Sequence, residues 1–221
     1  MLVDEAAGAR AGEAVLFQPG AAGHGSAPRL LVVDLYLGLP GACRKRARLD
    51  RRGRRVTKVF GFAGWSGAGK TTLIRQVIAR LVGQGLRVAT IKHAHHDFDI
   101  DQPGKDSWEH RQAGAAEVLV VSDRRWALMH ELRGAAEPSL PELIGKLAPA
   151  DLVLVEGFKR IAFPKMEVFR AANGKAPLHP EDGSIVAIAS DTPFPDSGRP
   201  VLPLDDVAVI STFAERHAQR L

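Results

Sequence analysis

Glycines followed by a lysine and a threonine form the clearest chemical pattern in the chain. Residues 64–71 read Gly-Trp-Ser-Gly-Ala-Gly-Lys-Thr, which fits the P-loop pattern G-x-x-x-x-G-K-[ST]. Glycines let the backbone turn tightly, so that several N–H groups can point at one phosphate chain. Lys70 can reach the β- and γ-phosphates of a nucleotide, and the Thr71 hydroxyl can ligate Mg²⁺. The pattern therefore predicts a site for a nucleoside triphosphate or a similar phosphate-rich ligand.

The segments on either side of this loop fit the same interpretation. Residues 58–63 are typical of a short buried strand, and residues 73–82 have apolar side chains near helical spacing. That helix would present its positive N-terminal end to the phosphates. A glycine-rich turn with a chance lysine is the alternative, and the strand, loop and helix in register argue against it. The candidate nucleotide-binding residues here are Gly64, Ser66, Gly67, Ala68, Gly69, Lys70, Thr71 and Thr72.

A second acidic position follows the apolar segment 151–155, where Glu156 precedes Gly157. Ligands bind in open α/β sheets at the carboxyl ends of the strands, and Glu156 is predicted to lie there. Its carboxylate could hold Mg²⁺ through water or polarise an attacking water. The alternative is an ordinary glutamate at a strand end with Gly157 serving the turn. With the P-loop present, we predict that Lys70 and Glu156 are catalytic and that Thr71 and Glu156 bind the metal.

The segment 92–106 is unusually rich in polar chemistry, with three histidines, four aspartates and two lysines in fifteen residues. It follows a predicted strand, so its start is expected at the same edge of the sheet. Three interpretations compete. The segment could sense the γ-phosphate with an aspartate near the metal, it could bind a transition metal through His93, His95 and His96, or it could be a solvated loop.

A carboxylate also follows the apolar segment 184–189, in the sequence Ser190-Asp191-Thr192-Pro193. A carboxylate can accept hydrogen bonds from N1 and N2 of guanine, which makes Asp191 a candidate base-binding residue. The N/T-K-x-D motif of regulatory GTPases is absent from the chain, and aspartate is also a common turn residue. Both readings of Asp191 remain open at this point.

Strands and helices alternate from residue 58 onward, which predicts an α/β fold with an open, mostly parallel sheet and helices on both faces, as in P-loop NTPases. Capping boxes are predicted at Asp106 with Glu109 and at Ser139 with Glu142. The predicted strands are 58–63, 85–91, 117–122, 126–132, 151–155, 166–170 and 184–189, and the predicted helices are 73–82, 106–114, 139–147 and 212–221.

Composition and charge separate the first 57 residues from the remainder. The chain has 221 residues and a net charge of +5, and all of this excess lies in residues 1–57, where ten Lys and Arg face five Asp and Glu. We interpret 1–57 as a basic, disordered leader and 58–221 as the nucleotide-binding domain. A second hypothesis is that the natural start lies near Val56, because a valine codon can initiate translation in bacteria.

Several classes of protein are disfavoured by the composition. No apolar run approaches the roughly 18 residues that a membrane span needs, and a single cysteine, Cys43, excludes an internal disulfide framework and favours the cytoplasm. The basic run of the leader contains no interleaved aromatic residue to stack on bases, which weakens a nucleic-acid role. We expect neither a membrane nor a nucleic acid as partner.

Three motifs in order resemble the molybdopterin-guanine dinucleotide biosynthesis adapter family, MobB. They are GFAGWSGAGKTTL at 61–73, IKHAHHDFDIDQPGKDSWEHRQAGA at 91–115 and LVEGFK at 154–159. The middle motif is long and unusual, so the resemblance is specific, and it covers residues 58 to about 220. The leader lies outside it.

The resemblance implies a GTP-binding P-loop protein that is usually a homodimer and that uses Mg²⁺. Such a protein works beside the molybdenum cofactor guanylyltransferase, which joins GMP to molybdopterin, and molybdopterin-bearing biosynthetic proteins are further expected partners. GTP hydrolysis by the protein itself is expected to be weak, and the sequence shows no obvious arginine finger or water-positioning glutamine in cis. Gly67, Gly69, Lys70, Thr71, Thr72 and Glu156 carry over from the family motifs.

Three other functions remain as alternatives. A P-loop small-molecule kinase would transfer the γ-phosphoryl group and carry an arginine-rich lid, and no such segment stands out. A nucleic-acid-associated ATPase would use the basic leader. A metallochaperone GTPase would bind Ni²⁺ or Zn²⁺ through His93, His95 and His96.

Overall fold

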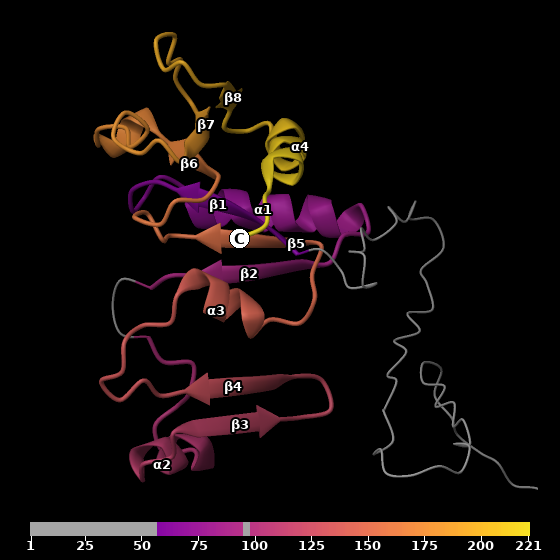
Figure 1. The fold of residues 1–221 in the computed structure, drawn as a ribbon, viewed down its shortest axis with the longest axis vertical. Coiled ribbons are helices and arrows are strands. Elements are labelled where there is room, and N and C mark those ends of the chain that lie inside the picture. Colours follow the sequence, from indigo (N-terminus) through magenta and orange to yellow (C-terminus); the bar gives the residue numbers. More distant parts are fainter. Residues whose placement is uncertain (1–56, 95–97) are drawn as a thin grey trace, which may run out of the picture. The chain divides into compact units, whose positions relative to one another are not determined.

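The computed structural model describes residues 57–94 and 98–221. Apart from Thr57, the predicted leader lies outside the described residues, as do His95, His96 and Asp97. The main element is a six-stranded sheet in the order β2-β5-β1-β6-β7-β8 (Figure 1). Its strands are β1 (Lys58–Ala63), β2 (Val88–Lys92), β5 (Leu152–Glu156), β6 (Lys165–Phe169), β7 (Ile185–Ser190) and β8 (Val201–Pro203).

All neighbouring strands of this sheet run parallel, so all six carboxyl ends point to one edge. The predicted α/β fold with a mostly parallel sheet is confirmed. The first half of β1 is not paired with β6 and instead takes a short C-terminal segment as its neighbour. Val59 and Gln219 exchange backbone hydrogen bonds of 2.7 and 3.1 Å there, in antiparallel orientation. The C-terminal end of the chain is thereby held beside the strand that leads into the P-loop.

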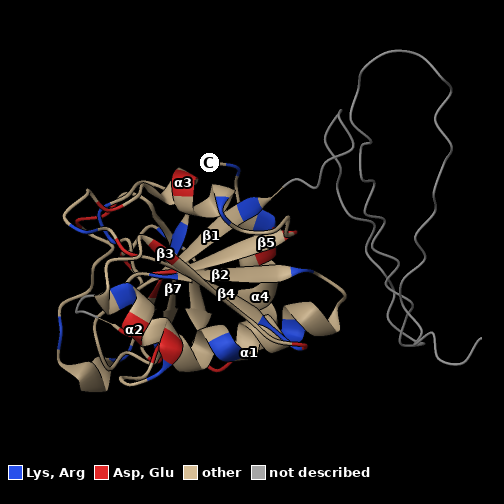
Figure 2. Ribbon diagram, turned by 90° about the horizontal axis from the view of Figure 1, so that it is seen from below, with Lys and Arg blue, Asp and Glu red and all other residues tan. Residues whose placement is uncertain are grey.

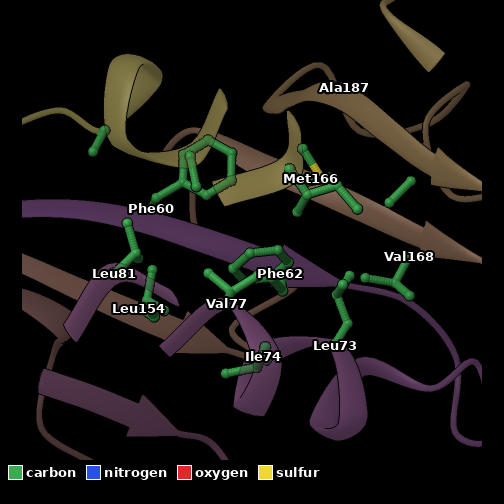
Figure 3. Packing of buried hydrophobic residues seen from close by; sticks show 14 of the residues in the cluster. Phe60, Phe62, Leu73, Ile74, Val77, Leu81, Leu154, Met166, Val168 and Ala187 are labelled. Atoms are coloured by element: carbon green, nitrogen blue, oxygen red, sulfur yellow. The ribbon is translucent and has the colours of Figure 1, made fainter. Parts of the chain in front are cut away.

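Two helices cover one face of the sheet, α1 (Lys70–Gly83) and α4 (Val207–His217), and they bury a common hydrophobic core. Phe60 and Phe62 of β1 lie in this core together with Leu73 and Val77 of α1 (Figure 3). The two phenylalanine rings pack edge to face, with centroids 5.7 Å apart. This packing fixes α1 against β1, and so fixes the loop that joins them.

The opposite face of the sheet is covered by α3 (Leu140–Gly145). Val59, Val153 and Val155 alternate with the residues of the first face and pack with Leu140 and neighbouring apolar side chains. Burial on both faces explains why residues 152–155 are apolar without interruption. Helices therefore lie on both faces, as predicted.

A separate antiparallel hairpin is formed by β3 (Glu117–Val121) and β4 (Trp126–His130), next to α2 (Asp106–Gln112). Arg111 of α2 holds the hairpin and the preceding loop together, with side-chain contacts to Asp99 at 2.6 Å, to Glu131 at 3.0 Å and to Asp101 at 3.5 Å. The pKa of Asp99 is lowered by the backbone hydrogen bond from Asp101 and by the hydrogen bond from Arg111.

Several predicted boundaries differ from the structure. The last helix begins at Val207, five residues earlier than predicted, because Asp206 caps it by accepting a hydrogen bond from the Val209 N–H at 3.0 Å. It ends at His217, and the last residues turn to pair with β1. The predicted capping box at Asp106 was wrong: Lys105 is the N-cap and makes no side-chain capping bond. The box at Ser139 and Glu142 is confirmed.

Charged side chains of both signs are interspersed over the helices and loops (Figure 2). Residues 58–221 carry twenty Lys and Arg and twenty Asp and Glu, so their net charge is zero. In the part of the chain that the structure describes, no helix is long and apolar enough to cross a bilayer.

Candidate nucleotide-binding site

The carboxyl ends of β2, β5 and β1 bring three sequence-distant segments together. Glu156 lies beside Phe62 of β1 on one side and beside Lys92 of β2 on the other. Phe62 is followed by Ala63 and then by the P-loop, so Glu156 lies next to the start of that loop. The parallel register thus places the predicted second acid at the P-loop, although 85 residues separate it from Thr71.

The P-loop adopts a conformation that needs glycine at both of its ends. Gly64 has φ +149, and a Cβ there would lie 2.5 Å from the carbonyl oxygen of Val168. Gly69 is the N-cap of α1 and has the left-handed φ of +88. Glycine adopts these angles without strain, which explains the two fixed positions of the motif. Helix α1 begins immediately afterwards, at Lys70, with its N-terminus at the loop.

Lys70 points back across the loop, where its Nζ donates a hydrogen bond of 2.9 Å to the carbonyl oxygen of Trp65. Burial lowers the pKa of Lys70, the nearby Glu156 carboxylate raises it in part, and the charges of Lys159 and Lys92 lower it further. Three lysines therefore share this edge of the sheet, and their charges favour an anionic ligand there.

Thr71 and Glu156, the two predicted metal residues, are in direct contact. The Thr71 hydroxyl donates to Oε1 of Glu156 at 3.1 Å, and Oε2 lies 3.5 Å away. A hydroxyl and a carboxylate are hard oxygen donors of the kind that Mg²⁺ takes together with phosphate oxygens and water. The donor set fits Mg²⁺, and these are the residues that would hold it.

The turn after Glu156 is held by a buried cation, Lys165. Lys165, the first residue of β6, has no exposed surface, and its Nζ donates to the Lys159 carbonyl at 2.9 Å and pairs with Asp182 at 3.0 Å. Lys159 in turn places its ammonium 4.6 Å from the ring centre of Trp65, in a cation–π contact. This arrangement fixes the Gly157-Phe158-Lys159 turn against the P-loop.

The segment after β6 also supports the P-loop, a role that was not predicted from the sequence. Asn173, in the short 3₁₀ helix η1 (Ala171–Asn173), donates from Nδ2 to the Ser66 carbonyl at 3.0 Å. Trp65 donates from Nε1 to the Ala176 carbonyl at 2.8 Å. These contacts join residues more than 100 positions apart, and no local pattern in the sequence signals them.

A buried carboxylate holds this supporting segment in place. Glu167 of β6 is 1% exposed and accepts hydrogen bonds from the backbone N–H groups of Leu178 at 2.6 Å and His179 at 3.0 Å. The His179 ring places Nδ1 2.9 Å from the same carboxylate, so Nδ1 carries the hydrogen that is donated. Each buried donor thus has an acceptor, and the segment is firmly attached to β6.

Asp191, the candidate base-binding residue, follows β7 at the same edge of the sheet. Its Oδ1 accepts a hydrogen bond of 2.9 Å from the backbone N–H of Ala171, and its Oδ2 lies 3.9 Å from a guanidinium nitrogen of Arg170. The carboxylate is partly exposed and retains acceptor capacity on both oxygens. Its position beside the P-loop support fits a role in binding the nucleotide, and the structure equally gives it a role in holding the turn.

Of the three histidines in the segment 92–106, the structure describes only His93. His93 lies 3.1 Å from Glu137 and packs against Phe158 at a ring distance of 4.8 Å. Asp99 and Asp101 are engaged by Arg111. Within residues 57–94 and 98–221 no group of three His, Cys, Asp or Glu side chains could hold a metal ion. His95 and His96, which the metallochaperone alternative invokes, lie outside these ranges.

The comparisons with known proteins agree with the motifs. The family described as "Molybdopterin guanine dinucleotide synthesis protein B", MobB, matches residues 59–191. The chain is 40% identical over 171 residues to the "Molybdopterin-guanine dinucleotide biosynthesis adapter protein" of Escherichia coli strain K12, covering 76% of this chain and 97% of that protein. It is 37% identical over 163 residues to the Haemophilus influenzae protein of the same description, covering 71% and 87%.

Solved structures share the fold. The "Crystal Structure of molybdopterin-guanine biosynthesis protein B (mobB)" superposes with a TM-score of 0.56 at 27% identity, covering 70% of this chain and 96% of that one. The Bacillus subtilis MobB structure superposes with a TM-score of 0.60 at 23% identity, covering 73% and 98%. The chain belongs to the MobB family, the adapter proteins of molybdopterin-guanine dinucleotide biosynthesis.

Proposed function

We propose that this adapter binds GTP with Mg²⁺ in the cytoplasm and hydrolyses it slowly, and that it assists the guanylyltransferase that attaches GMP to molybdopterin. The observation that carries the proposal is the contact between Thr71 and Glu156 beside Lys70. It brings the P-loop, a cation and two oxygen donors of the kind that Mg²⁺ takes together in one place, which supports the proposal. The glycines and Thr72 of the P-loop complete the proposed phosphate contacts.

The proposed residues divide the work between binding and chemistry. The backbone N–H groups of residues 66–72 would cradle the phosphates, and Lys70 would neutralise their charge. Mg²⁺ would add positive charge at the phosphate oxygens. Glu156 would orient a water near the γ-phosphate through its second oxygen. Because Glu156 also contacts Thr71, it is committed to the metal site, which supports slow rather than rapid hydrolysis.

Guanine selectivity is assigned to Asp191. β6 lies next to the P-loop strand β1, and β7 follows beyond β6, so that a nucleotide held by the P-loop can extend its base over β6 toward the carboxyl end of β7. The Asp191 carboxylate would accept from N1 and N2 of guanine, whereas adenine offers an unprotonated N1 there. A pair of hydrogen bonds to a charged group gives roughly 10- to 100-fold preference.

We also propose that the adapter is a homodimer and that the hairpin β3–β4 forms its interface. Leu119, Val121, Trp126 and Leu128 lie on one face of the hairpin, and this face has no cover from the described residues of the chain. A cluster of four large apolar side chains on one sheet face is typical of a protein–protein contact. Molybdopterin-bearing biosynthetic proteins and the guanylyltransferase are the proposed further partners.

Calorimetric titration of the full chain with GTP and with ATP, each with Mg²⁺, tests the nucleotide assignment. We expect GTP to bind roughly 10- to 100-fold more tightly than ATP, and Lys70→Ala to abolish the binding of both. Asp191→Asn keeps one acceptor for the Ala171 N–H but presents an amide to the base, so it should remove the preference for GTP. Asp196→Asn, an exposed aspartate in the following loop, is the matched control.

Three results would contradict the proposal. Equal binding of GTP and ATP by the wild-type protein would remove the guanine assignment, and preference for ATP would favour a P-loop kinase. Unchanged Mg²⁺-dependent binding and hydrolysis in Glu156→Gln would remove the metal assignment. If GTP is preferred, co-purification with a guanylyltransferase in the presence and absence of GTP tests the adapter contact directly.

A further inference from the structure

A second cation faces the P-loop from outside the motif. Arg170 follows β6, the strand beside β1, and its guanidinium lies at the N-cap of α1. A Cβ placed on Gly69 would be 3.6 Å from Nη2 of Arg170 and 3.9 Å from its Nε. The glycine at this position keeps space free in front of the backbone, where the phosphates approach a P-loop. The guanidinium therefore lies in or beside that space.

We propose that Arg170 is a phosphate-binding residue of this site, and that it exchanges Asp191 for the phosphate chain when a nucleotide binds. The proposal rests on the nucleotide-binding function proposed above and adds a residue that neither the P-loop motif nor the family match assigns. An arginine can bind two phosphate oxygens with its parallel N–H groups, which gives both charge and direction.

The ion pair between Arg170 and its present partner, Asp191, is weak. The distance of 3.9 Å between Nη1 and the Asp191 carboxylate is at the limit of an ion pair and too long for a hydrogen bond. The Arg170 side chain is 46% exposed, and an exposed pair of this kind contributes little stability. Asp191 loses little if Arg170 leaves, because its Oδ1 keeps the hydrogen bond from the Ala171 N–H.

The exchange joins the phosphate site to the proposed base site. Arg170 and Ala171 are adjacent in the chain, and Asn173 of the same turn holds the Ser66 carbonyl of the P-loop. When Arg170 turns to the phosphates, the Asp191 carboxylate loses its neighbouring cation, and its Oδ2 stays open to a hydrogen-bond donor of the base. Arg170 thus binds the phosphates, while Asp191, its former partner, binds the base.

Calorimetric titration of the full chain with inorganic tripolyphosphate and with GTP, each with Mg²⁺, tests the proposal. Arg170→Ala should weaken both ligands by a similar factor, about 10- to 100-fold for a lost charged hydrogen-bond pair. Arg170→Lys should lose less, because it retains the charge without the planar geometry. Arg216→Ala, which removes an exposed arginine from α4, is the matched control and should bind both ligands as the wild type does.

The outcomes separate this proposal from the function on which it rests. If the wild type binds GTP and Arg170→Ala binds GTP and tripolyphosphate within about twofold of it, the phosphate role is wrong while the nucleotide assignment stands. If Arg170→Ala lowers the unfolding temperature without ligand and Arg170→Lys does not rescue binding, Arg170 acts only as a structural residue, which also overturns the proposal. If the wild type binds neither ligand, both the function and the Arg170 role fail.

Discussion

At the scale of single residues, several charged side chains of the site act on Lys70 and shift its pKa. Its pKa is lowered because burial removes solvent from the ammonium, and Lys159 and Lys92 add repulsion, although Glu156 opposes them. A bound phosphate chain would act in the opposite direction and raise the pKa. The difference between the two states means that ligand binding and protonation of Lys70 are coupled.

We predict that GTP affinity falls at a lower pH than it would if Lys70 had the pKa of an ordinary lysine. The charged ammonium binds the phosphates, so affinity is complete below the pKa of Lys70 in the free protein and falls as the pH rises through it. Lys159→Gln removes one cause of the lowered pKa, and the decline should therefore move to higher pH. Titrations of both proteins across the same alkaline series measure this shift.

The comparison between the two proteins also removes the titration of the guanine base itself, which affects both equally. Coincident declines for wild type and Lys159→Gln would show that Lys70 does not govern the profile. A decline displaced to lower pH would contradict the assigned sign of the Lys159 effect.

The residues of the site differ in how far the sequence could predict them. Lys70, Thr71 and the glycines follow from a local pattern, and Glu156 follows from its position at a strand end. The supports of the loop, Asn173 and Ala176, could not be predicted, because their contacts with the P-loop join positions more than 100 residues apart. Arg170 was missed because no arginine motif marks it; only the strand order brings it to Gly69.

At the scale of elements, the segment between β6 and β7 is the least regular part of the site, and it depends on Glu167. Glu167 accepts hydrogen bonds from two backbone N–H groups and one imidazole, and all three donors lie in this segment. His179 packs its ring against Phe194, with centroids 5.2 Å apart, and Phe194 packs on Phe169. The carboxylate and the aromatic contacts together fix the segment that holds the P-loop.

We predict that Glu167→Ala destabilises the protein by about 3 kcal/mol, because a buried donor without an acceptor costs roughly 1–3 kcal/mol and three donors lose theirs. GTP binding should weaken as well, since the supports at Asn173 and Ala176 lose their fixed position. Urea unfolding and GTP titration measure the two effects. Glu181→Ala, at an exposed position of the same segment, should leave both unchanged. A stable variant with normal binding would show that the segment is held by other contacts.

Element boundaries were least predictable where side chains compete with the backbone preference. Val207, Val209 and Ile210 are β-branched and disfavour a helix locally, and the helix predicted from the sequence, 212–221, begins only after them. Packing of Ile210 and Ala214 in the core below α4 overrides that preference. The strand β8 was not predicted because it has only three residues and ends in a proline.

At the scale of the whole molecule, the chain combines the parallel sheet that carries the candidate site with a separate two-stranded hairpin. The family assignment predicted from three motifs is confirmed by the match at residues 59–191 and by the Escherichia coli relative. Residues 58–221 carry no net charge, which gives this part no overall electrostatic attraction to nucleic acid. The sequence predicted both strands of the hairpin but not that they form a sheet of their own.

The hairpin has one covered and one uncovered face. Val118 and Met129 are buried on the covered face, while Val121 and Trp126, which are paired across the strands, are 71% and 66% exposed on the other. Leu119 and Leu128 form the neighbouring exposed pair. A two-stranded sheet is only marginally stable alone, so association with a second copy would stabilise the hairpin as well as hide its apolar face.

We predict that Leu119→Lys combined with Leu128→Glu converts a dimer into a monomer. The new charges face each other across the hairpin, where an opposite-charge pair is tolerated, so the hairpin itself should persist. In the dimer, however, these charges would be buried against an apolar surface, which is strongly unfavourable. Sedimentation equilibrium of the full chain measures the change. Val209→Glu, which charges an exposed apolar position on α4, should remain dimeric. A double variant as dimeric as the wild type would place the hairpin outside the interface, and a monomeric wild type would remove the dimer itself.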